Sequence, residues 1–263
     1  MLMNFDKELE VAKEAAVAAG NVIMDIYNNH EILKIEYKDE NMPLTIADKS
    51  ANSIITKILK EKFPKYAILS EEEKDDTKRL KNDLCFIVDP LDGTKEFIKR
   101  NGQFTVNIAL SYKHKSVMGV IYVPVTKELY YSELGKGSFL IEANNKKHKL
   151  HVNTNAKEKK DLKVVMSNSH SCKEMNYLLK KYNISNYIKV GSSLKGCMIA
   201  RGQADVYYRF NPTMEWDTAA MQCIVEEAGG IFRQIDDSLM IYNRKNKVND
   251  KGFYIINITE SKL

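Results

Sequence analysis

The sequence predicts a protein of the α+β / α/β class in two parts, with an antiparallel sheet in the N-terminal part and a mixed sheet in the C-terminal part. Two observations support this class. Residues 5–131 hold two long amphipathic segments followed by short apolar segments separated by turn residues, whereas residues 162–228 alternate between strand-like and helical patterns. Alternation of this kind favours α/β layers. We place the boundary near residue 157, which divides the chain into residues 1–157 and 158–263.

The chain opens with two amphipathic helices, expected over residues 5–27 and 48–63, the second of which Pro64 ends. Apolar side chains recur three and four residues apart in both segments, so each helix has one face to bury. The expected buried face of the first helix consists of Leu9, Ala12, Ala16, Ala19, Ile23 and Ile26. Both helices therefore need a sheet to pack against.

Short apolar segments with turn residues between them predict that sheet. We expect an antiparallel meander packed on the two helices, with an acidic turn after its first strand. The expected strands are residues 66–69, 84–88, 104–112, 116–123 and 128–131.

Beyond residue 146 the pattern changes. The lysine-rich tract at 146–160 is expected to be a polar surface loop that joins the two parts. Gly229-Gly230 is a strong stop for the last helix. The expected strands after the tract are residues 162–166, 187–190 and 204–208, and the expected helices are residues 172–182, 194–201 and 216–228.

Net charge and the distribution of apolar residues indicate which classes of function fit the sequence. The net charge of +5, from 40 Lys and Arg against 35 Asp and Glu, suits a small anionic substrate and is too weak and too evenly spread for a nucleic acid polymer. No stretch approaches the roughly 18 apolar residues of a membrane span. Asp6, Glu8 and Glu10 lie where a secretory signal needs an apolar core, so we expect a cytoplasmic protein. Loose attachment to the inner face of a membrane stays open, as does the choice between monomer and homodimer.

The four cysteines are scattered and form no C-x-x-C pair, which argues against a zinc site or a disulfide framework. We expect reduced and mostly buried thiols at Cys85, Cys172, Cys197 and Cys223.

The string D-P-L-D-G-T at residues 89–94 carries the chemistry. Two carboxylates three residues apart follow an apolar strand, and Pro90 is expected to break that strand so that both converge. Gly93 allows close approach of a ligand to the backbone, and a helix start near Lys95 offers free N–H groups. Taken alone, the string fits an acidic turn that caps a helix as well as it fits a site for magnesium and phosphate.

Further carboxylates lie at Glu71, after a strand, and at Asp48 and Asp217, each of which opens a helix. Any one of them alone is better explained as an ordinary cap. In order along the chain, however, S-E-E at residues 70–72, D-P-L-D-G-T and W-D at residues 216–217 resemble the signatures of the inositol monophosphatase superfamily. These are lithium-sensitive, metal-dependent phosphatases, and the resemblance covers about residues 5–258.

The resemblance implies a layered αβαβα sandwich, as in inositol monophosphatases and fructose bisphosphatases, with the active site between two subdomains. It also implies two to three Mg²⁺ ions, which can activate a water and neutralise a phosphoryl group. The implied metal ligands are Glu71, Asp89, Asp92, Asp217 and the carbonyl of Leu91, and the residues implied to position the attacking water are Asp48, Glu71 and Thr94.

Four further segments resemble one branch of this superfamily, the CysQ-type bisphosphate nucleotidases. They are T-K-E-F-I at residues 94–98, where inositol monophosphatases usually carry T-N-F, G-V-I-Y-V-P at 119–124, G-S-S-L-K at 191–195 and Y-R-F-N-P-T at 208–213. One departure is Asn168, which stands where members of this branch often carry Arg. The implied substrate-binding residues are Gly93, Thr94, Ser167, His170, Gly191 and Lys195, with Lys195 the natural partner of a second phosphate.

Three functions are weighed. The first is hydrolysis of 3′-phosphoadenosine 5′-phosphate to AMP and phosphate, with the 5′-phosphosulfate analogue as a second candidate substrate. The second is inositol monophosphatase or broad sugar phosphatase activity. The third is a catalytically silent binding or regulatory homologue, against which the intact set of carboxylates argues.

Overall fold

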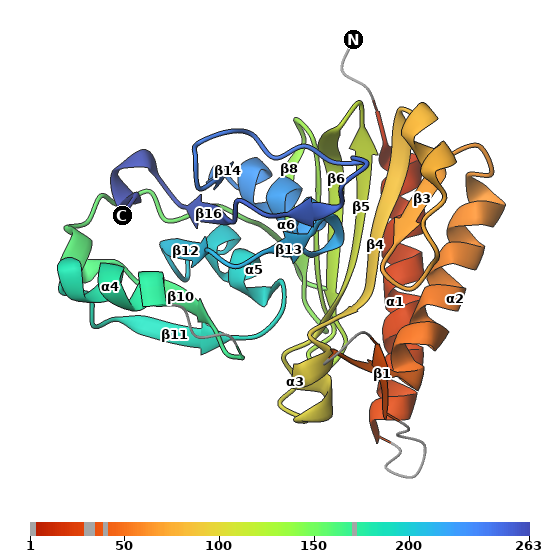
Figure 1. Cartoon of the computed structure of the whole chain (residues 1–263), viewed down its shortest axis with the longest axis horizontal. Coiled ribbons are helices and arrows are strands. Elements are labelled where there is room, and N and C mark those ends of the chain that lie inside the picture. Colours follow the sequence, from red (N-terminus) through yellow and green to blue (C-terminus); the bar gives the residue numbers. More distant parts are fainter. Residues whose placement is uncertain (1–3, 29–34, 39–41, 170–172) are drawn as a thin grey trace.

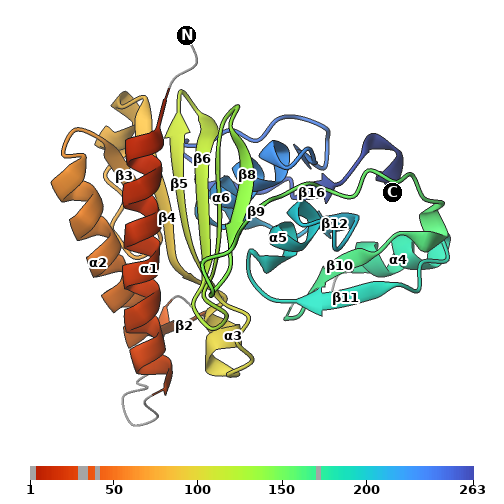
Figure 2. The same cartoon turned by 180° about the vertical axis from the view of Figure 1, so that it is seen from behind.

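Five alternating layers of helix and sheet make up the protein (Figure 1). The helices α1 (Asp6–Asn28) and α2 (Ile46–Lys62) form one outer layer, and α4 (Lys173–Lys181) lies on the other outer side. Figure 2 shows α1 and α2 side by side over the large sheet. The order confirms the predicted αβαβα sandwich. The structure is a computed structural model that describes residues 4–28, 35–38, 42–169 and 173–263.

The large sheet has seven strands in sequence order, and every neighbouring pair is antiparallel except β3 and β4, which are parallel. This confirms the predicted antiparallel meander from β4 onward, and it corrects the prediction for the first strand, which is parallel to its neighbour. The last two strands were not predicted. The final strand β9 corrects the expectation of a polar loop from residue 146, because Leu150 and Val152 just beyond it are buried. The strands are β3 (Ala67–Ser70), β4 (Leu84–Asp92), β5 (Thr105–Tyr112), β6 (Lys115–Val123), β7 (Glu128–Glu133), β8 (Gly137–Ile141) and β9 (Lys147–Lys149).

Both faces of the large sheet are covered, which explains why its central strands read as continuous apolar runs. Along β4, Phe86 and Val88 join the core beneath α1 and α2. The alternate residues Cys85 and Ile87 join a second core on the opposite face. Both faces of β4 are therefore covered along residues 85–88.

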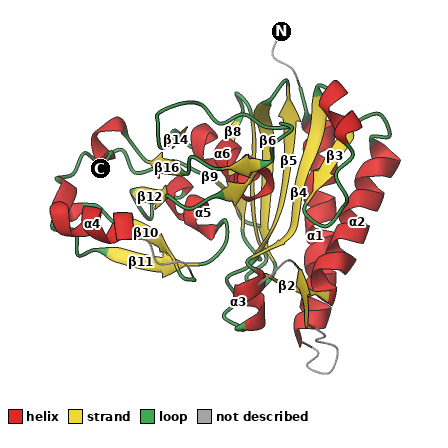
Figure 3. Ribbon diagram, viewed as in Figure 1, coloured by secondary structure: helices red, strands yellow, loops and turns green. Residues whose placement is uncertain are grey.

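Two helices fill the layer between the sheets, α5 (Leu194–Ala200) and α6 (Glu215–Glu227). The second helix approaches the sheet closely at Gly119 of β6, where an added Cβ would lie 2.4 Å from the carbonyl oxygen of Ala220. Figure 3 shows this helix between the two sheets.

The small sheet is mixed, as predicted, in the order β11-β10-β12-β16-β14. The first two pairings are parallel and the last two antiparallel. Its last two strands in the sequence, β14 and β16, were not predicted. The strands are β10 (Val164–Ser167), β11 (Tyr187–Val190), β12 (Val206–Arg209), β14 (Ile231–Gln234) and β16 (Phe253–Ile256).

The remaining elements are short. Among the described residues, no helix is long and apolar enough to cross a membrane. The core between the sheets takes side chains from both expected parts of the chain, so their division near residue 157 stays a prediction. The short elements within the described residues are β1 (Ile35–Lys38) paired with β2 (Met42–Thr45), β13 (Thr213–Met214) paired with β15 (Val248–Asn249), α3 (Thr94–Ile98), and the 3₁₀ turns η2 (Thr77–Lys81), η3 (Lys159–Asp161) and η4 (Thr259–Ser261).

Candidate metal and phosphate site

A bulge in β4 brings two carboxylates to one face of the strand. Asp89 pairs with Asn107 and Asp92 pairs with Thr105, so three steps along β4 match two along β5. Residues three apart in a regular strand point to opposite faces, and the one extra residue restores the same face. The expectation that Pro90 breaks the strand is therefore wrong, because the strand continues to Asp92 through the bulge.

Side chains from two other elements orient Asp92. Its Oδ2 accepts hydrogen bonds from Ser193 Oγ at 2.7 Å and Asn107 Nδ2 at 3.2 Å. The Thr105 hydroxyl lies 3.0 Å from Asn107 Oδ1 and 3.5 Å from Asp92 Oδ2. Ser193 precedes α5 and the other two residues alternate along β5, so groups from two elements orient the Asp92 carboxylate.

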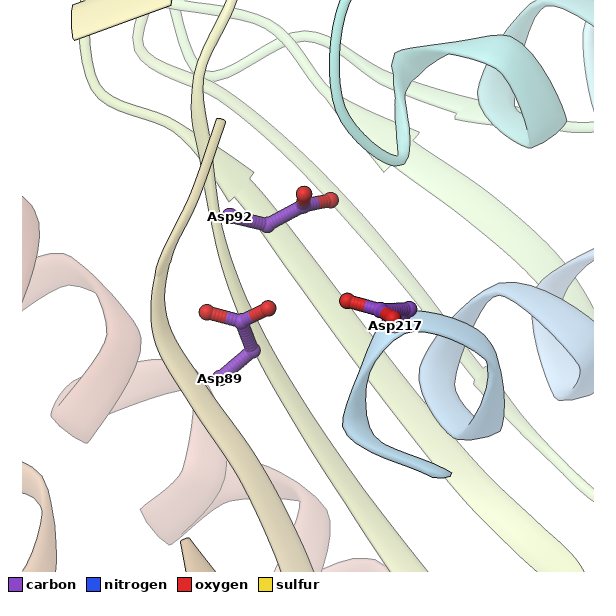
Figure 4. Close-up of side chains that lie close together, drawn as sticks. All are labelled: Asp89, Asp92 and Asp217. Carbon is purple, nitrogen blue, oxygen red and sulfur yellow. The ribbon is translucent and has the colours of Figure 1, made fainter. Parts of the chain in front are cut away.

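The third carboxylate comes from the C-terminal part of the chain. Asp217 lies in the first turn of α6, where its Oδ2 accepts a hydrogen bond from the backbone N–H of Met214 at 2.6 Å. One carboxylate oxygen from each of Asp89, Asp92 and Asp217 lies within 4.8 Å of the others. Figure 4 shows the side chains of Asp89 and Asp92 on β4 directed toward Asp217 at the start of the helix.

The remaining residues predicted for metal and water lie around this trio. Glu71 follows β3 and lines the same cavity as the three aspartates. The Thr94 hydroxyl lies 3.3 Å from both the Asp48 carboxylate and the Leu91 carbonyl oxygen. Asp48 is 3% exposed and contacts Thr94 from the first turn of α2, outside the lining of the cavity. The structure thus brings together all seven residues predicted for metal and water, while their individual roles stay predictions.

The donor set fits a hard divalent cation. Burial, and then the charge of Glu71, raises the pKa of Asp89 well above its usual value, and burial, followed by Asp92, raises the pKa of Asp217 to about 7. Carboxylates packed together repel one another, and a bound cation removes that cost. Oxygen ligands of this kind are those that Mg²⁺ prefers.

These shifts predict how the metal-free protein responds to pH. The folded-state pKa values of Asp89 and Asp217 are raised, so the folded protein holds protons that the unfolded chain has released. Stability is therefore highest below about pH 4 as far as these two groups are concerned, and it falls as the pH rises toward about 7. Thermal melts in EDTA should show this fall, and added Mg²⁺ should reverse it at pH 7. A slope that Mg²⁺ leaves unchanged would contradict the assignment.

Two basic side chains lie in the same cavity, which has a volume of about 420 Å³. Lys195 is 7% exposed and donates to the carbonyl oxygen of Ser192 at 2.5 Å. Burial lowers its pKa to about 8, and Asp92 opposes that shift. Within the described part of the chain, the buried Nε of Arg209 has no hydrogen-bond partner. Buried donors of this kind suit an anionic ligand.

The predicted substrate-binding residues divide into two groups. Gly93, Ser167, Gly191 and Lys195 all line the cavity with Thr94, whereas His170 lies outside the described residues. Gly93 has a φ of 96°, the left-handed region that favours glycine, and its added Cβ would lie 3.1 Å from the Gln103 carbonyl oxygen.

Sequence reasoning missed Arg209, Ser193, Asn107 and Thr105. Arg209 and Ser193 lie in the segments Y-R-F-N-P-T and G-S-S-L-K. Each segment was compared with the family as a whole, and neither side chain was given a role of its own. The last two are polar residues two apart in an otherwise apolar strand, and that spacing could have indicated one face of β5 directed toward Asp92.

Comparisons with known proteins agree with this geometry. The family model described as "Inositol monophosphatase family" matches residues 4–258. A Buchnera aphidicola protein named 3′(2′),5′-bisphosphate nucleotidase CysQ is 38% identical over 251 residues, which cover 94% of this chain and 93% of the relative. The Escherichia coli K12 protein of the same name is 35% identical, with 94% and 98% covered. The crystal structure of CysQ from Bacteroides thetaiotaomicron superposes with a TM-score of 0.84 at 38% identity, over 97% of this chain and 98% of that one. The chain belongs to the inositol monophosphatase family.

Proposed function

We propose that this protein is a Mg²⁺-dependent phosphomonoesterase that hydrolyses the 3′-phosphate of 3′-phosphoadenosine 5′-phosphate, giving AMP and phosphate. The observation that carries the proposal is one cavity that contains a carboxylate trio and, on other elements, two basic side chains, the buried Lys195 and the partly buried Arg209. A substrate with two separate phosphates matches that division. The names of the most similar relatives support the same substrate class.

Glu71, Asp89, Asp92, Asp217 and the Leu91 carbonyl would hold the metal. When bound, Mg²⁺ supplies a water with a lowered pKa and charge that offsets the phosphoryl oxygens. The chain's own contribution is orientation, since Ser193, Asn107 and Thr105 hold Asp92 in place. The attacking water adds to phosphorus as the bond to the 3′ oxygen breaks.

We propose that Thr94 orients the attacking water. Its hydroxyl donates toward Asp48 Oδ2 or the Leu91 carbonyl, both at 3.3 Å, so its lone pairs are left to accept from a water in the cavity. Asp48 acts through Thr94 and is a positioning residue.

Thr94→Ala should lower the turnover number by about 100-fold, because the water loses an oriented hydrogen-bond partner. Mg²⁺ affinity should change little, since the hydroxyl is not a proposed ligand. Thr94→Ser keeps the hydroxyl and should restore most of the turnover number. Steady-state kinetics with a Mg²⁺ titration separate these quantities, and an unchanged turnover number in the Ala variant would remove Thr94 from the mechanism.

We propose that the retained 5′-phosphate lies against Lys195 and Arg209. The ammonium and the guanidinium are both expected to carry positive charge at pH 7 when an anion is bound. Gly191 and Ser167 line the same cavity, which supports their predicted roles beside the nucleoside.

Lys195→Ala should raise the Michaelis constant for the bisphosphate by more than about tenfold, as a charged hydrogen bond is worth roughly 1.5–3 kcal/mol. Adenosine 3′-phosphate, which lacks the second phosphate, should be affected little. Lys189→Ala, which removes an exposed lysine of β11, is the control and should behave as the wild type. Equal losses on both substrates would show damage to the site in place of a phosphate contact.

A substrate panel with Mg²⁺ tests the function itself. We expect hydrolysis of 3′-phosphoadenosine 5′-phosphate to exceed that of inositol 1-phosphate, and the 5′-phosphosulfate analogue belongs in the same panel. We also propose inhibition by lithium, which is close to Mg²⁺ in size with half its charge. Faster hydrolysis of inositol 1-phosphate would assign the protein to the other branch, and no Mg²⁺-dependent release would leave a silent homologue.

We propose a reducing compartment, the cytoplasm, as the setting of this reaction. Three thiols in the described part of the chain, Cys85, Cys197 and Cys223, are free and buried, which is typical of proteins kept reduced.

A further inference from the structure

A buried network of charged side chains joins the loop after β3 to the start of α6. Its centre is Arg79 in η2, whose side chain is 2% exposed. The guanidinium pairs with both carboxylate oxygens of Asp75, from Nε at 2.7 Å and from Nη2 at 3.1 Å. These contacts close the turn formed by residues 75–79, which begins four residues after Glu71.

The same guanidinium reaches across to the C-terminal part of the chain. Nη1 donates to Asn243 Oδ1 and Nη2 donates to the Arg244 carbonyl oxygen, both at 2.7 Å. The Asn243 amide returns hydrogen bonds to the carbonyl oxygens of Arg79 at 3.2 Å and Asn82 at 3.1 Å. Two of the four hydrogen bonds from this planar fork therefore connect segments more than 160 residues apart, and the other two hold Asp75.

Glu215 completes the connection to α6. It is fully buried, and its carboxylate accepts from the backbone N–H groups of Asn243 at 2.6 Å and Arg244 at 2.9 Å. The Arg244 side chain adds a contact to the same carboxylate from Nε at 3.1 Å. Glu215 stands two residues before Asp217, so the 243–244 segment lies between the Arg79 fork and the turn that carries Asp217.

We propose that Arg79 and Glu215 are positioning residues that set the distance between Glu71 and Asp217, and thereby the affinity of the site for divalent cations. This rests on the proposed function, in which both carboxylates bind metal. The two come from different parts of the chain, and a cation held by both requires their relative position to be fixed. Arg79 is suited to that role because its fork is rigid and uses its Nε and both Nη atoms here.

The test replaces the guanidinium of Arg79 with a side chain of the same charge. Arg79→Lys retains the positive charge but cannot reproduce four directed hydrogen bonds. We expect its dissociation constant for Mn²⁺, measured from the electron paramagnetic resonance of the free ion, to rise by about tenfold or more. Arg201→Lys is the matched control. Arg201 also joins the two parts of the chain, through Glu128 and Tyr130 at 2.8 Å, and lies outside the cavity lining.

Thermal melts in EDTA show whether the two lysine variants are folded and by how much each is destabilised. Arg201→Lys should lower the melting temperature and leave Mn²⁺ affinity within about twofold of the wild type. Equal Mn²⁺ affinity in Arg79→Lys and the wild type would overturn the proposal. A wild type that binds no Mn²⁺ and releases no phosphate would instead overturn the proposed function.

Arg79→Gln distinguishes a positioning role of Arg79 from a purely electrostatic effect on Mn²⁺ binding. Removal of a positive charge near a cation site should tighten cation binding if charge alone matters. Weaker Mn²⁺ binding in this variant would support positioning, and tighter binding would overturn it. Should Arg79→Gln fail to fold, the comparison of the two lysine variants still decides between these outcomes.

Discussion

Asp217→Asn should lower Mg²⁺-dependent release of phosphate by at least about 100-fold. Loss of a residue that hydrogen-bonds to a metal ligand already lowers metal affinity or activity by roughly 10–100-fold, and Asp217 is itself a proposed ligand. The Asn side chain can still accept the hydrogen bond from the backbone N–H of Met214, so α6 should keep its first turn. Removing one of several crowded charges should also raise the melting temperature of the metal-free protein at pH 7.

Glu226→Gln on the same helix is the control for this variant. Its carboxylate is partly buried, pairs with Arg233 at 2.9 Å and lies outside the cavity lining. It should retain wild-type kcat/KM. Retention of wild-type kcat/KM in Asp217→Asn, in contrast, would exclude Asp217 as a ligand and with it the proposed site.

Gly119→Val should destabilise the protein by about 3 kcal/mol or more, at or above the upper end of the usual cost of overpacking. A Cβ at this position would lie 2.4 Å from the Ala220 carbonyl oxygen and 3.0 Å from its Cα, both of which are backbone atoms. Because both sides of the contact are backbone, α6 and β6 must move apart to relieve it. Because Asp217 lies on this helix, Mg²⁺ affinity should fall together with stability.

Val120→Ala is the companion to that variant. Val120 is the next residue of β6, is fully buried, and faces the core beneath α1 and α2. Its truncation should lower the free energy of unfolding, measured by urea denaturation, and leave Mg²⁺ affinity unchanged. If Gly119→Val also retains wild-type Mg²⁺ affinity, the close contact does not position the site.

The elements with a strong local period were predictable from the sequence. Residues 5–27 and 48–63 were expected to be helical because their apolar residues recur with the period of a helix, and the structure has helices at Asp6–Asn28 and Ile46–Lys62. The strands β14 and β16 were missed. Each has four residues, and β16 is defined by pairing with β12, more than 40 residues away in the sequence. The strands β3, β10, β11 and β12 are equally short and were predicted from their apolar residues, so the missing information is the distant partner and not the length of the segment.

The site was predictable only in part, for a related reason. The two carboxylates of β4 are close in sequence, and a proline between them indicates irregular backbone in a strand. A proline at this position is compatible with a break in the strand and with a bulge, and only the pairing with β5 distinguishes the two. The approach of Asp217 to Asp89, across more than 120 residues, has no local signal at all. It was expected because of a resemblance to known phosphatases, and the packing of α6 against β6 is its physical cause.

The position of α6 between the two sheets determines how the protein behaves when the chain is divided into two fragments. A break near residue 157 separates the aspartates of β4 from Asp217, yet it does not separate two cores, since α6 covers one face of the large sheet. An N-terminal fragment would expose to water the apolar side chains of that face, among them Ile87, Ile121 and Val123. The two fragments should therefore aggregate when produced singly, and reassemble into an active pair when produced together.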